Sequence, residues 1–277
     1  MTEHVFDQAI ALSSQGDGLW AGQTHPAYAN MVGPFGGITA AQVLSAVLQH
    51  PQRLGEPVAL TVNYCTGVAD GAFEVHARPA RTNRSTQHWV IEMRQQGQTV
   101  ITATAVTAAR RETWSVDEEP MPVCPAPDQV PLPAQSPPLA WAQRYEMRAL
   151  TGTLPGVWND GGDSSLSQLW MRDNPPRPLD FASLTALSDL FFPRVFLRRA
   201  RLVPVGTVSM TVYFHASTEQ LAQTGTGYLL GQARAQSFFN GFFDQNAAAG
   251  DESKQFLNSV FVHNPLLDAG REIGVDA

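Results

Sequence analysis

One acidic side chain stands alone in an apolar segment, and it is the first candidate for chemistry. Asp189 is the only ionisable residue between Asp180 and Arg194, and leucines and phenylalanines surround it in the sequence. Burial raises the pKa of a carboxyl group, so this side chain could accept a proton near neutral pH. The alternative is a solvated or capping carboxylate on a helix that begins near Asp180. The segment therefore offers a general base or an ordinary acidic residue.

A pair of glycines, Gly36 and Gly37, precedes a second candidate feature. Residues 38–50 are apolar on most sides and predict a buried helix that ends before Pro51. The first amides of a helix lack partners within it and lie at the positive end of its dipole, so they can stabilise a developing oxyanion. Glycine would let a reacting group approach that backbone. The pair could equally be the turn that starts the helix.

The elements that must position these groups form an internal repeat. Strand-like residues 60–64 resemble residues 210–214, an offset of 150. Three more strands are expected after each, at 73–81, 86–94 and 99–109 and then at 228–236, 239–248 and 255–263. A helix at 181–192, ending at Pro193, takes the place in the second half that 38–50 takes in the first. The matching order predicts a duplication.

The repeat predicts an α+β fold of two tandem units, each with a long central helix wrapped by an antiparallel sheet. Residues 120–138 contain eight prolines, which predicts an extended linker. We therefore expect an N-terminal unit at 1–115, a Pro-rich linker at 116–145 and a C-terminal unit at 146–277. Exposed sheet edges would allow further pairing into a homo-oligomer.

Composition excludes several classes of function. The net charge of −7 and the pI of about 5.4 argue against nucleic acid as a partner. Two cysteines, Cys65 and Cys124, and scattered histidines predict neither a disulfide framework nor a metal site. No run of 18 apolar residues is present, and the first ten residues do not read as a signal peptide, so we expect a cytoplasmic protein without a membrane segment.

The order and spacing of several motifs resemble the acyl-CoA thioesterase II (TesB-like) family, which has a double-hotdog fold. In the first half these motifs are GGITAA at 36–41, LTVNY at 60–64, ARTNRSTQ at 80–87 and EMRQQGQ at 92–98. In the second half they are SDLFFP at 188–193 and GTVSMTVYFH at 206–215. The resemblance covers about 31–110 and 180–264. It implies hydrolysis of fatty acyl-CoA without a cofactor, through an Asp, a Thr and a Gln that position a water.

The resemblance assigns these roles to particular residues. Asp189 lies at the position of the family's Asp, and Thr207 has the spacing from His215 expected for the Thr. The Gln position is occupied by Val262, which cannot hold a water by hydrogen bonding. Gln255 or Asn258 could substitute only if the register of the last strand were shifted.

Other residues could contact the substrate, each with a plainer interpretation. Gly36 and Gly37 would bind the oxyanion, and Arg84 and Ser85, with Arg81, could meet the CoA phosphates or simply face solvent. The same two interpretations apply to the basic residues Arg194, Arg198, Arg199 and Arg201. The aromatic side chains Phe238, Phe239, Phe242 and Phe243 could line an acyl pocket or pack a core. Cys65 reads as a small packing residue rather than a nucleophile.

Three functions are therefore in competition. The first is an acyl-CoA thioesterase with Asp189 as base and Thr207 as water ligand. The second is a catalytically impaired protein of the same fold that binds acyl-CoA or another apolar ligand, which the valine at 262 favours. The third, a hydratase, ranks last because no Asp and His occur at the short spacing such enzymes use.

Overall fold

The protein is described by a computed structural model covering residues 3–116, 118, 120–134, 138–159, 161–201, 203–251 and 256–265. The elements of the first half are α1 (Val5–Ala9), β1 (Ser13–Gly16), β2 (Leu19–Gln23), η1 (Pro26–Tyr28), α2 (Gly36–Leu48), β3 (Glu56–Tyr64), β4 (Ala72–Thr82), β5 (Thr86–Gln95) and β6 (Gln98–Ala108). Those that follow are η2 (Pro127–Gln129), η3 (Trp141–Arg144), β7 (Tyr145–Thr151), β8 (Ser167–Asp173), α3 (Phe181–Leu187), α4 (Val195–Arg198), β9 (Ser209–Phe214), α5 (Thr218–Thr224), β10 (Leu229–Arg234), β11 (Phe238–Phe239), β12 (Phe242–Gly250) and β13 (Phe256–Pro265).

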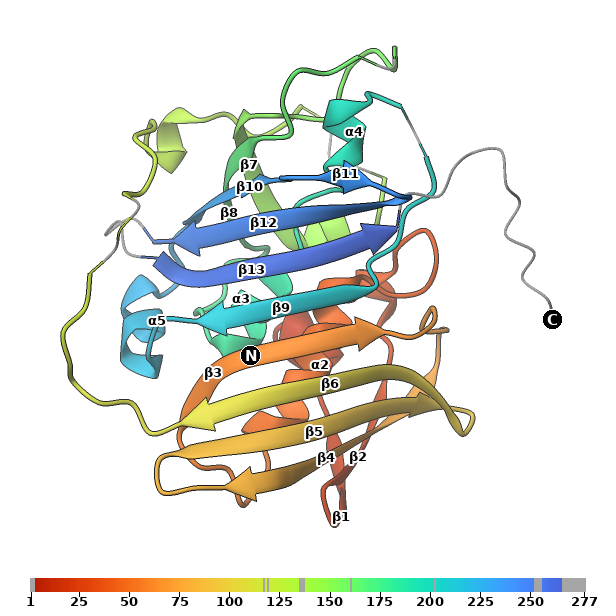
Figure 1. Ribbon diagram of the computed structural model, residues 1–277, viewed down its shortest axis with the longest axis vertical. Coiled ribbons are helices and arrows are strands. Elements are labelled where there is room, and N and C mark those ends of the chain that lie inside the picture. Colours follow the sequence, from red (N-terminus) through yellow and green to blue (C-terminus); the bar gives the residue numbers. More distant parts are fainter. Residues whose placement is uncertain are drawn as a thin grey trace.

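Across the described residues, thirteen strands form one large antiparallel sheet (Figure 1). Read outward from its centre, the order is β3-β6-β5-β4-β2-β1 on one side and β9-β13-β12-β10-β8-β7 on the other. Each of these twelve strands thus has a counterpart at the same rank in the other half, and β11 pairs with β12 outside this order. The centre lies at β3 and β9, where Thr61 is directly opposite Thr211 and their hydroxyl oxygens are 3.0 Å apart. These two residues differ by 150 in number, which is the offset between the two copies predicted from the sequence.

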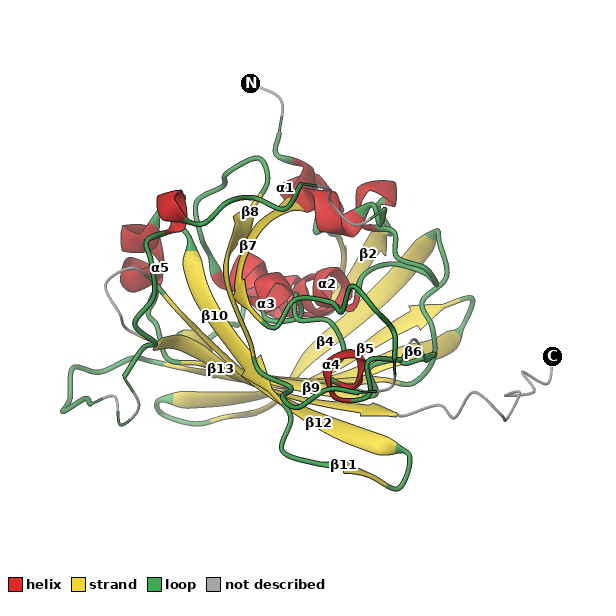
Figure 2. Ribbon diagram, turned by 90° about the horizontal axis from the view of Figure 1, so that it is seen from above, coloured by secondary structure: helices red, strands yellow, loops and turns green. Residues whose placement is uncertain are grey.

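The helices α2 and α3 contact each other inside the concave face of the curved sheet (Figure 2). The 13 residues of α2 contain no charged side chain, and the turns from Gly37 to Val47 are all buried. A helix that is apolar around its circumference must be covered on every side, which the curvature of the sheet achieves. This places the N-terminus of α2 in the interior.

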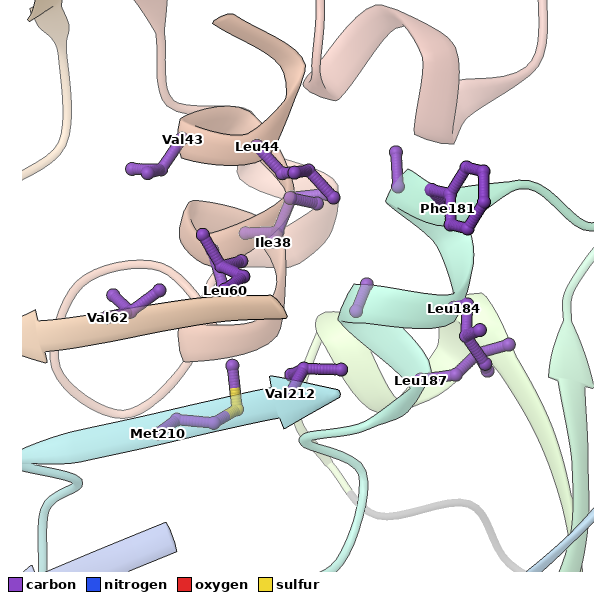
Figure 3. Close-up of a cluster of buried hydrophobic side chains, with 14 of the residues drawn as sticks. Ile38, Val43, Leu44, Leu60, Val62, Phe181, Leu184, Leu187, Met210 and Val212 are labelled. Carbon is purple, nitrogen blue, oxygen red and sulfur yellow. The ribbon is translucent and has the colours of Figure 1, made fainter. Parts of the chain in front are cut away.

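The core between helices and sheet follows the period-2 pattern of the central strands. Leu60 and Val62 of β3 and Met210 and Val212 of β9 point toward the helices and are fully buried (Figure 3). Alternate residues of a strand face opposite sides, so Thr61 and Thr211 lie on the outer face. Burying each large apolar side chain contributes about 1.5–3 kcal/mol, which holds both helices on the centre of the sheet.

The second central helix is shorter than the sequence predicted. A helix was expected over 181–192, but α3 ends at Leu187, and the Asp189 amide donates back to Ala186 O at 3.2 Å in the closing turn. The chain then leaves the helical path before Pro193, whose ring disfavours helical geometry at the residue preceding it. Asp189 therefore lies in the turn after α3 and not within the helix.

The four predicted strands of each half are present, with boundaries within four residues of those expected. Two pairs of outer strands were not predicted: β1 with β2, and β7 with β8. The four residues of β1 are all exposed, and β7 has only a weak alternation of burial, so neither carries the periodic signal of a half-buried strand.

In the part of the chain that the structure describes, the helices are too short or too polar to cross a membrane.

Candidate active site

The carboxyl group of Asp189 lies against the start of α2. A Cβ atom placed on Gly36 would be 2.8 Å from Asp189 Oδ2, so only a glycine leaves room for the carboxyl here. The backbone amide of Gly37 hydrogen-bonds to the same group. The turn after the second-half helix and the first turn of the first-half helix thus meet, as the contact between α2 and α3 requires.

Burial gives this carboxyl an unusual proton affinity. Desolvation raises the pKa of Asp189 to about 7, and the Gly37 amide opposes that rise by favouring the ionised form. The Asp189 charge in turn contributes to raising the pKa of Tyr64 and of Tyr145, after the larger effect of burial. A carboxyl with a pKa of about 7 can both take up and release a proton under physiological conditions.

The second glycine has a different function from the first. A Cβ atom on Gly37 would be 2.6 Å from the carbonyl oxygen of Ala186 and 2.5 Å from the Phe35 ring, so Gly37 permits the close approach of α3. Phe35, the N-cap of α2, makes no side-chain capping bond, and the first turn contains no acidic residue. The first amides of α2 are therefore left to Asp189 and to whatever binds beside it.

Tyr64, which the sequence argument did not single out, joins the two halves at this point. Its hydroxyl donates to Gly36 O at 2.9 Å, and its amide donates to Val208 O at 3.0 Å. Thr207 is the residue before Val208 and is partly buried. The segment that leads into β9 therefore brings Thr207 to the end of β3 at which Tyr64 reaches Gly36.

The position assigned to a glutamine is apolar in three dimensions as well. Val262 of β13 is buried and pairs with Met210 on one side and with Gln245 of β12 on the other. Gln245 is buried too, but its Oε1 accepts from Arg194 Nε at 3.2 Å. The side-chain amide of Gln245, on the strand next to β13 in the sheet, is therefore already hydrogen-bonded to an arginine.

Comparison with known proteins identifies the chain. Residues 25–108 match the family model described as the acyl-CoA thioesterase N-terminal domain, and residues 121–260 match the acyl-CoA thioesterase C-terminal domain. The chain belongs to the acyl-CoA thioesterase family. The TesB-like resemblance read from its motifs is confirmed. No curated protein sequence matches it significantly.

Solved structures agree with this family assignment. A conserved protein of unknown function with a hot dog fold from Alicyclobacillus acidocaldarius is 45% identical, with a TM-score of 0.91 over 96% of this chain and 99% of that one. The acyl-CoA thioesterase II TesB2 from Mycobacterium marinum is 18% identical, with a TM-score of 0.75 over 97% and 100% of the two chains. The tesB protein of Mycobacterium avium subsp. paratuberculosis is 17% identical, with a TM-score of 0.76 over 95% and 98%. The last two show the shared fold.

In this acyl-CoA thioesterase family member, Asn258 hydrogen-bonds to the residue that precedes Asp189. Its Nδ2 donates to Ser188 Oγ at 2.6 Å, and Ser188 Oγ donates to Leu184 O at 2.7 Å. Asn258 is opposite Phe214, at the far end of β9 from Thr207. Asn258 therefore binds the residue next to Asp189 through its Nδ2, while its buried Oδ1 has no hydrogen-bond partner among the described residues. The other candidate, Gln255, lies outside the described residues.

Two predicted phosphate contacts lie far from the carboxyl. Arg84 and Ser85 belong to the turn between β4 and β5, and Ser85 O accepts from the Ala109 amide beside the start of β3. Tyr64 is at the other end of that strand, roughly 26 Å away at about 3.3 Å per residue. The structure therefore does not bring Arg84 and Ser85 together with Asp189, Gly36 and Gly37.

The basic run that begins at Arg194 is not one solvated face. Arg194 is fully buried, and its guanidinium donates to Phe192 O, Ser165 O and Ser167 Oγ as well as to Gln245. Desolvation lowers its pKa to about 9. Arg198, Arg199 and Arg201 are exposed. Arg194 therefore neither faces solvent nor is exposed to bind phosphate, so both interpretations of this run were wrong for it. The spacing of basic residues could not show that Ser167 of β8 and Gln245 of β12 would surround its guanidinium.

Two hollows lie on the outer face of the sheet. One, of about 380 Å³, is lined by Ser209, Thr211, Gln236, Asp244, Asn246, Phe261 and Val262. A neighbouring one of about 180 Å³ contains Phe239, Phe242 and Phe243 among its lining residues. Asp189 lines neither of them. Phe239 and Phe242 are largely exposed, and Phe238 stacks on the buried Phe243, so these aromatic residues form the β11–β12 hairpin away from the carboxyl. Cys65 is exposed.

A second buried carboxyl escaped the sequence argument. Asp173, at the end of β8, is buried and accepts a hydrogen bond from Ser183 Oγ at 2.5 Å, and burial raises its pKa to about 6. The preceding residues 165–172 mix polar and apolar side chains, so no signal in the sequence indicated that Asp173 would be buried. Tyr145, opposite Asp173 in the sheet, belongs to an aromatic cluster with Phe35 and Tyr28 beside the start of α2.

Among the described residues, no group of three or more His, Cys, Asp or Glu side chains could hold a metal ion.

These two carboxyls predict how stability depends on pH. A pKa raised in the folded state means that the folded protein binds more protons than the unfolded chain, so stability falls as pH rises from about 4 to about 7. Asp189→Asn removes the larger part of this slope and should increase the free energy of unfolding at pH 8 by about 1–3 kcal/mol. Asp189 is only partly buried and retains some exposed surface, so solvent screening keeps this effect below that of a fully buried group. Denaturant unfolding at pH 5 and pH 8 measures both effects. A variant less stable than the wild type at pH 8 would contradict the expectation.

Proposed function

We propose that this protein hydrolyses fatty acyl-CoA thioesters to the free acid and CoA, with Asp189 as the general base and Thr207 orienting the water. Membership of the acyl-CoA thioesterase family supports the reaction class. The observation that carries the assignment is the Asp189 carboxyl held at the start of α2 with a pKa of about 7. A base with this pKa is substantially ionised at neutral pH and still basic enough to take a proton from water.

In the proposed reaction, water is the nucleophile and the thiolate is the leaving group. Asp189 takes one proton from the water as its oxygen bonds to the thioester carbon, and the carbonyl oxygen becomes negative. Because the Gly37 amide is engaged by Asp189, we assign the oxyanion to the Gly36 amide and the positive end of the α2 dipole. The C–S bond then breaks, and the proton held by Asp189 passes to the CoA sulfur.

The test is to mix the purified protein with medium-chain acyl-CoA and a thiol reagent. Release of free CoA at a rate well above that of the buffer supports the proposal. The buried Val262, at the place where the family resemblance puts a glutamine, favours the second candidate function, a protein that binds acyl-CoA without hydrolysing it. Saturable binding of acyl-CoA measured by calorimetry, with no CoA released, would establish that function instead.

Thr207 offers a separate prediction. Thr207→Val keeps the volume of the side chain but removes its hydroxyl, so the water loses one of its hydrogen-bonding partners. We expect kcat to fall by about 10- to 100-fold, because a misplaced nucleophile costs rate more than binding. Thr207→Ser is the matched control and should retain most of the activity. Equal activity of the valine and serine variants, measured by thiol release, would remove Thr207 from the mechanism.

A further inference from the structure

One peptide group connects two hydroxyls to the Asp189 carboxyl. The carbonyl oxygen of Gly36 accepts from Tyr64 OH at 2.9 Å and from Thr39 Oγ1 at 2.8 Å. The amide of Gly37, the other end of the same peptide, hydrogen-bonds to Asp189. In a trans peptide the C=O and N–H point in opposite directions, so the hydroxyls lie on one side of this unit and the carboxyl on the other.

The two hydroxyls differ in what they imply. A threonine that bonds to the carbonyl three residues earlier is a common feature of helices, and Thr39 alone would need no explanation. Tyr64 comes from β3, 28 residues further along the chain, and its backbone is fixed by the bond from its amide to Val208 O at 3.0 Å. Strand β3 thus places the Tyr64 hydroxyl on the Gly36 carbonyl, which belongs to the same peptide as the amide that contacts Asp189.

The electrostatic consequence follows from the order of the bonds. Donors that bond to a carbonyl polarise its peptide, which strengthens the bond donated by the attached N–H by about 10–30%. A stronger bond from the Gly37 amide favours the ionised carboxylate and opposes the desolvation that favours the neutral acid. The hydroxyls therefore act on the proton affinity of a group that they do not touch.

Among the described residues, few ionisable groups surround Asp189, so a change in its pKa can be attributed to the two hydroxyls. The described side chains whose titration responds to it are phenols, Tyr64 from β3 and Tyr145 from β7. No ionisable residue occurs in α2, and the nearest along the chain are Asp180, which caps α3, and the buried Arg194. Burial and the Asp189 charge raise the pKa of Tyr64 well above its ordinary value, so its hydroxyl remains a donor at every pH of interest.

We propose that Tyr64 and Thr39 are positioning residues that act on Asp189 through the Gly36–Gly37 peptide, holding the Gly37 amide against the carboxylate and favouring its ionised form. In the thioesterase reaction proposed above, on which this inference rests for its functional meaning, they keep the base available near neutral pH. Tyr64 thus influences the ionisation of Asp189. The sequence analysis had named no residue for this role, because valine occupies the position that the family resemblance gives to a glutamine.

The test is a titration of the Asp189 carboxyl by 13C NMR in protein labelled at aspartate, with the signal assigned from the Asp189→Asn spectrum. Tyr64→Phe removes the hydroxyl and keeps the ring, and it should raise the Asp189 pKa by about 0.5. Thr39→Val should raise it in the same direction, so a second variant is available if the first folds poorly. The acid limb of the kcat/KM profile should move by the same amount, with kcat on the alkaline plateau little changed.

Tyr145→Phe is the matched control. Its hydroxyl also lies near Asp189 but is buried without a hydrogen-bond partner, so its loss should leave the carboxyl pKa within about 0.2 of the wild type. An unchanged or lowered Asp189 pKa in both Tyr64→Phe and Thr39→Val would overturn the inference, as would an equal rise in Tyr145→Phe. Because the carboxyl titration needs no turnover, a protein that fails to hydrolyse acyl-CoA would refute the proposed function while this measurement still decides the inference.

Discussion

Asp189→Asn is expected to lower kcat/KM for acyl-CoA hydrolysis by about a thousand-fold while the protein remains folded. The amide has nearly the shape of the carboxyl and can still accept from the Gly37 amide, but it cannot take a proton from water. In the wild type, kcat/KM should rise about tenfold per pH unit below pH 7 and level off above it, because only the ionised Asp189 is a base. In Asp189→Asn this limb should disappear.

Asp173→Asn is the matched control for that experiment. Asp173 is a buried carboxyl with a raised pKa too, but it accepts a hydrogen bond from Ser183, near the start of α3. We expect this variant to keep most of the wild-type activity and the acid limb near pH 7. Hydrolysis by Asp189→Asn within tenfold of the wild type would rule out Asp189 as the base.

Gly36→Ala should reduce activity by about a hundred-fold with little loss of stability. The added methyl group would be 2.8 Å from Asp189 Oδ2 and 3.4 Å from the Tyr64 hydroxyl, so the carboxyl must move away from the Gly37 amide. A displacement of about 1 Å at a reacting group is enough for such a loss. Alanine is otherwise favoured over glycine in a helix by roughly 0.5–1 kcal/mol, which partly offsets the strain.

Two other glycines separate this effect from general damage. Gly156→Ala, where the added methyl group would meet no atom within 4 Å, should leave both activity and stability unchanged. Gly37→Ala would press on the Ala186 carbonyl at 2.6 Å and should lower stability as well as activity. Thiol release and denaturant unfolding of the three variants give the comparison. Full activity in Gly36→Ala would show that the carboxyl does not need its present position.

The parts of the structure that the sequence could predict are those with periodic signals. The offset of 150 between residues 60–64 and 210–214 predicted two equivalent strands, and the structure shows that they pair at the centre of the sheet with Thr61 opposite Thr211. Asp189 could be singled out because no other charge is near it in sequence, and the glycines because they precede a fully apolar helix. These features depend on one segment at a time.

The other site residues depend on contacts between distant segments. Tyr64 ends an ordinary strand, and only the fold shows its hydroxyl on Gly36 O. Arg194 reads as a surface residue until Ser165, Ser167 and Gln245 are seen to surround it. The end of α3 before Asp189 was missed because Pro193 marked the latest stopping point of a helix and gave no sign of an earlier one.

The mirrored order of the strands has a consequence for stoichiometry. Counted from the first residue of each helix, the counterpart of Asp189 is Leu44, which is completely buried. The counterpart of the open start of α2 is the start of α3, where Asp180 Oδ1 accepts from the Ser183 amide at 2.8 Å and so caps the helix. The two equivalent places therefore differ: the turn after α3 holds the carboxyl of Asp189, and the start of α2 provides the backbone amide that it contacts. In the mechanism that we propose, the two halves therefore supply different parts of one site, and a half expressed alone would lack either Asp189 or the start of α2.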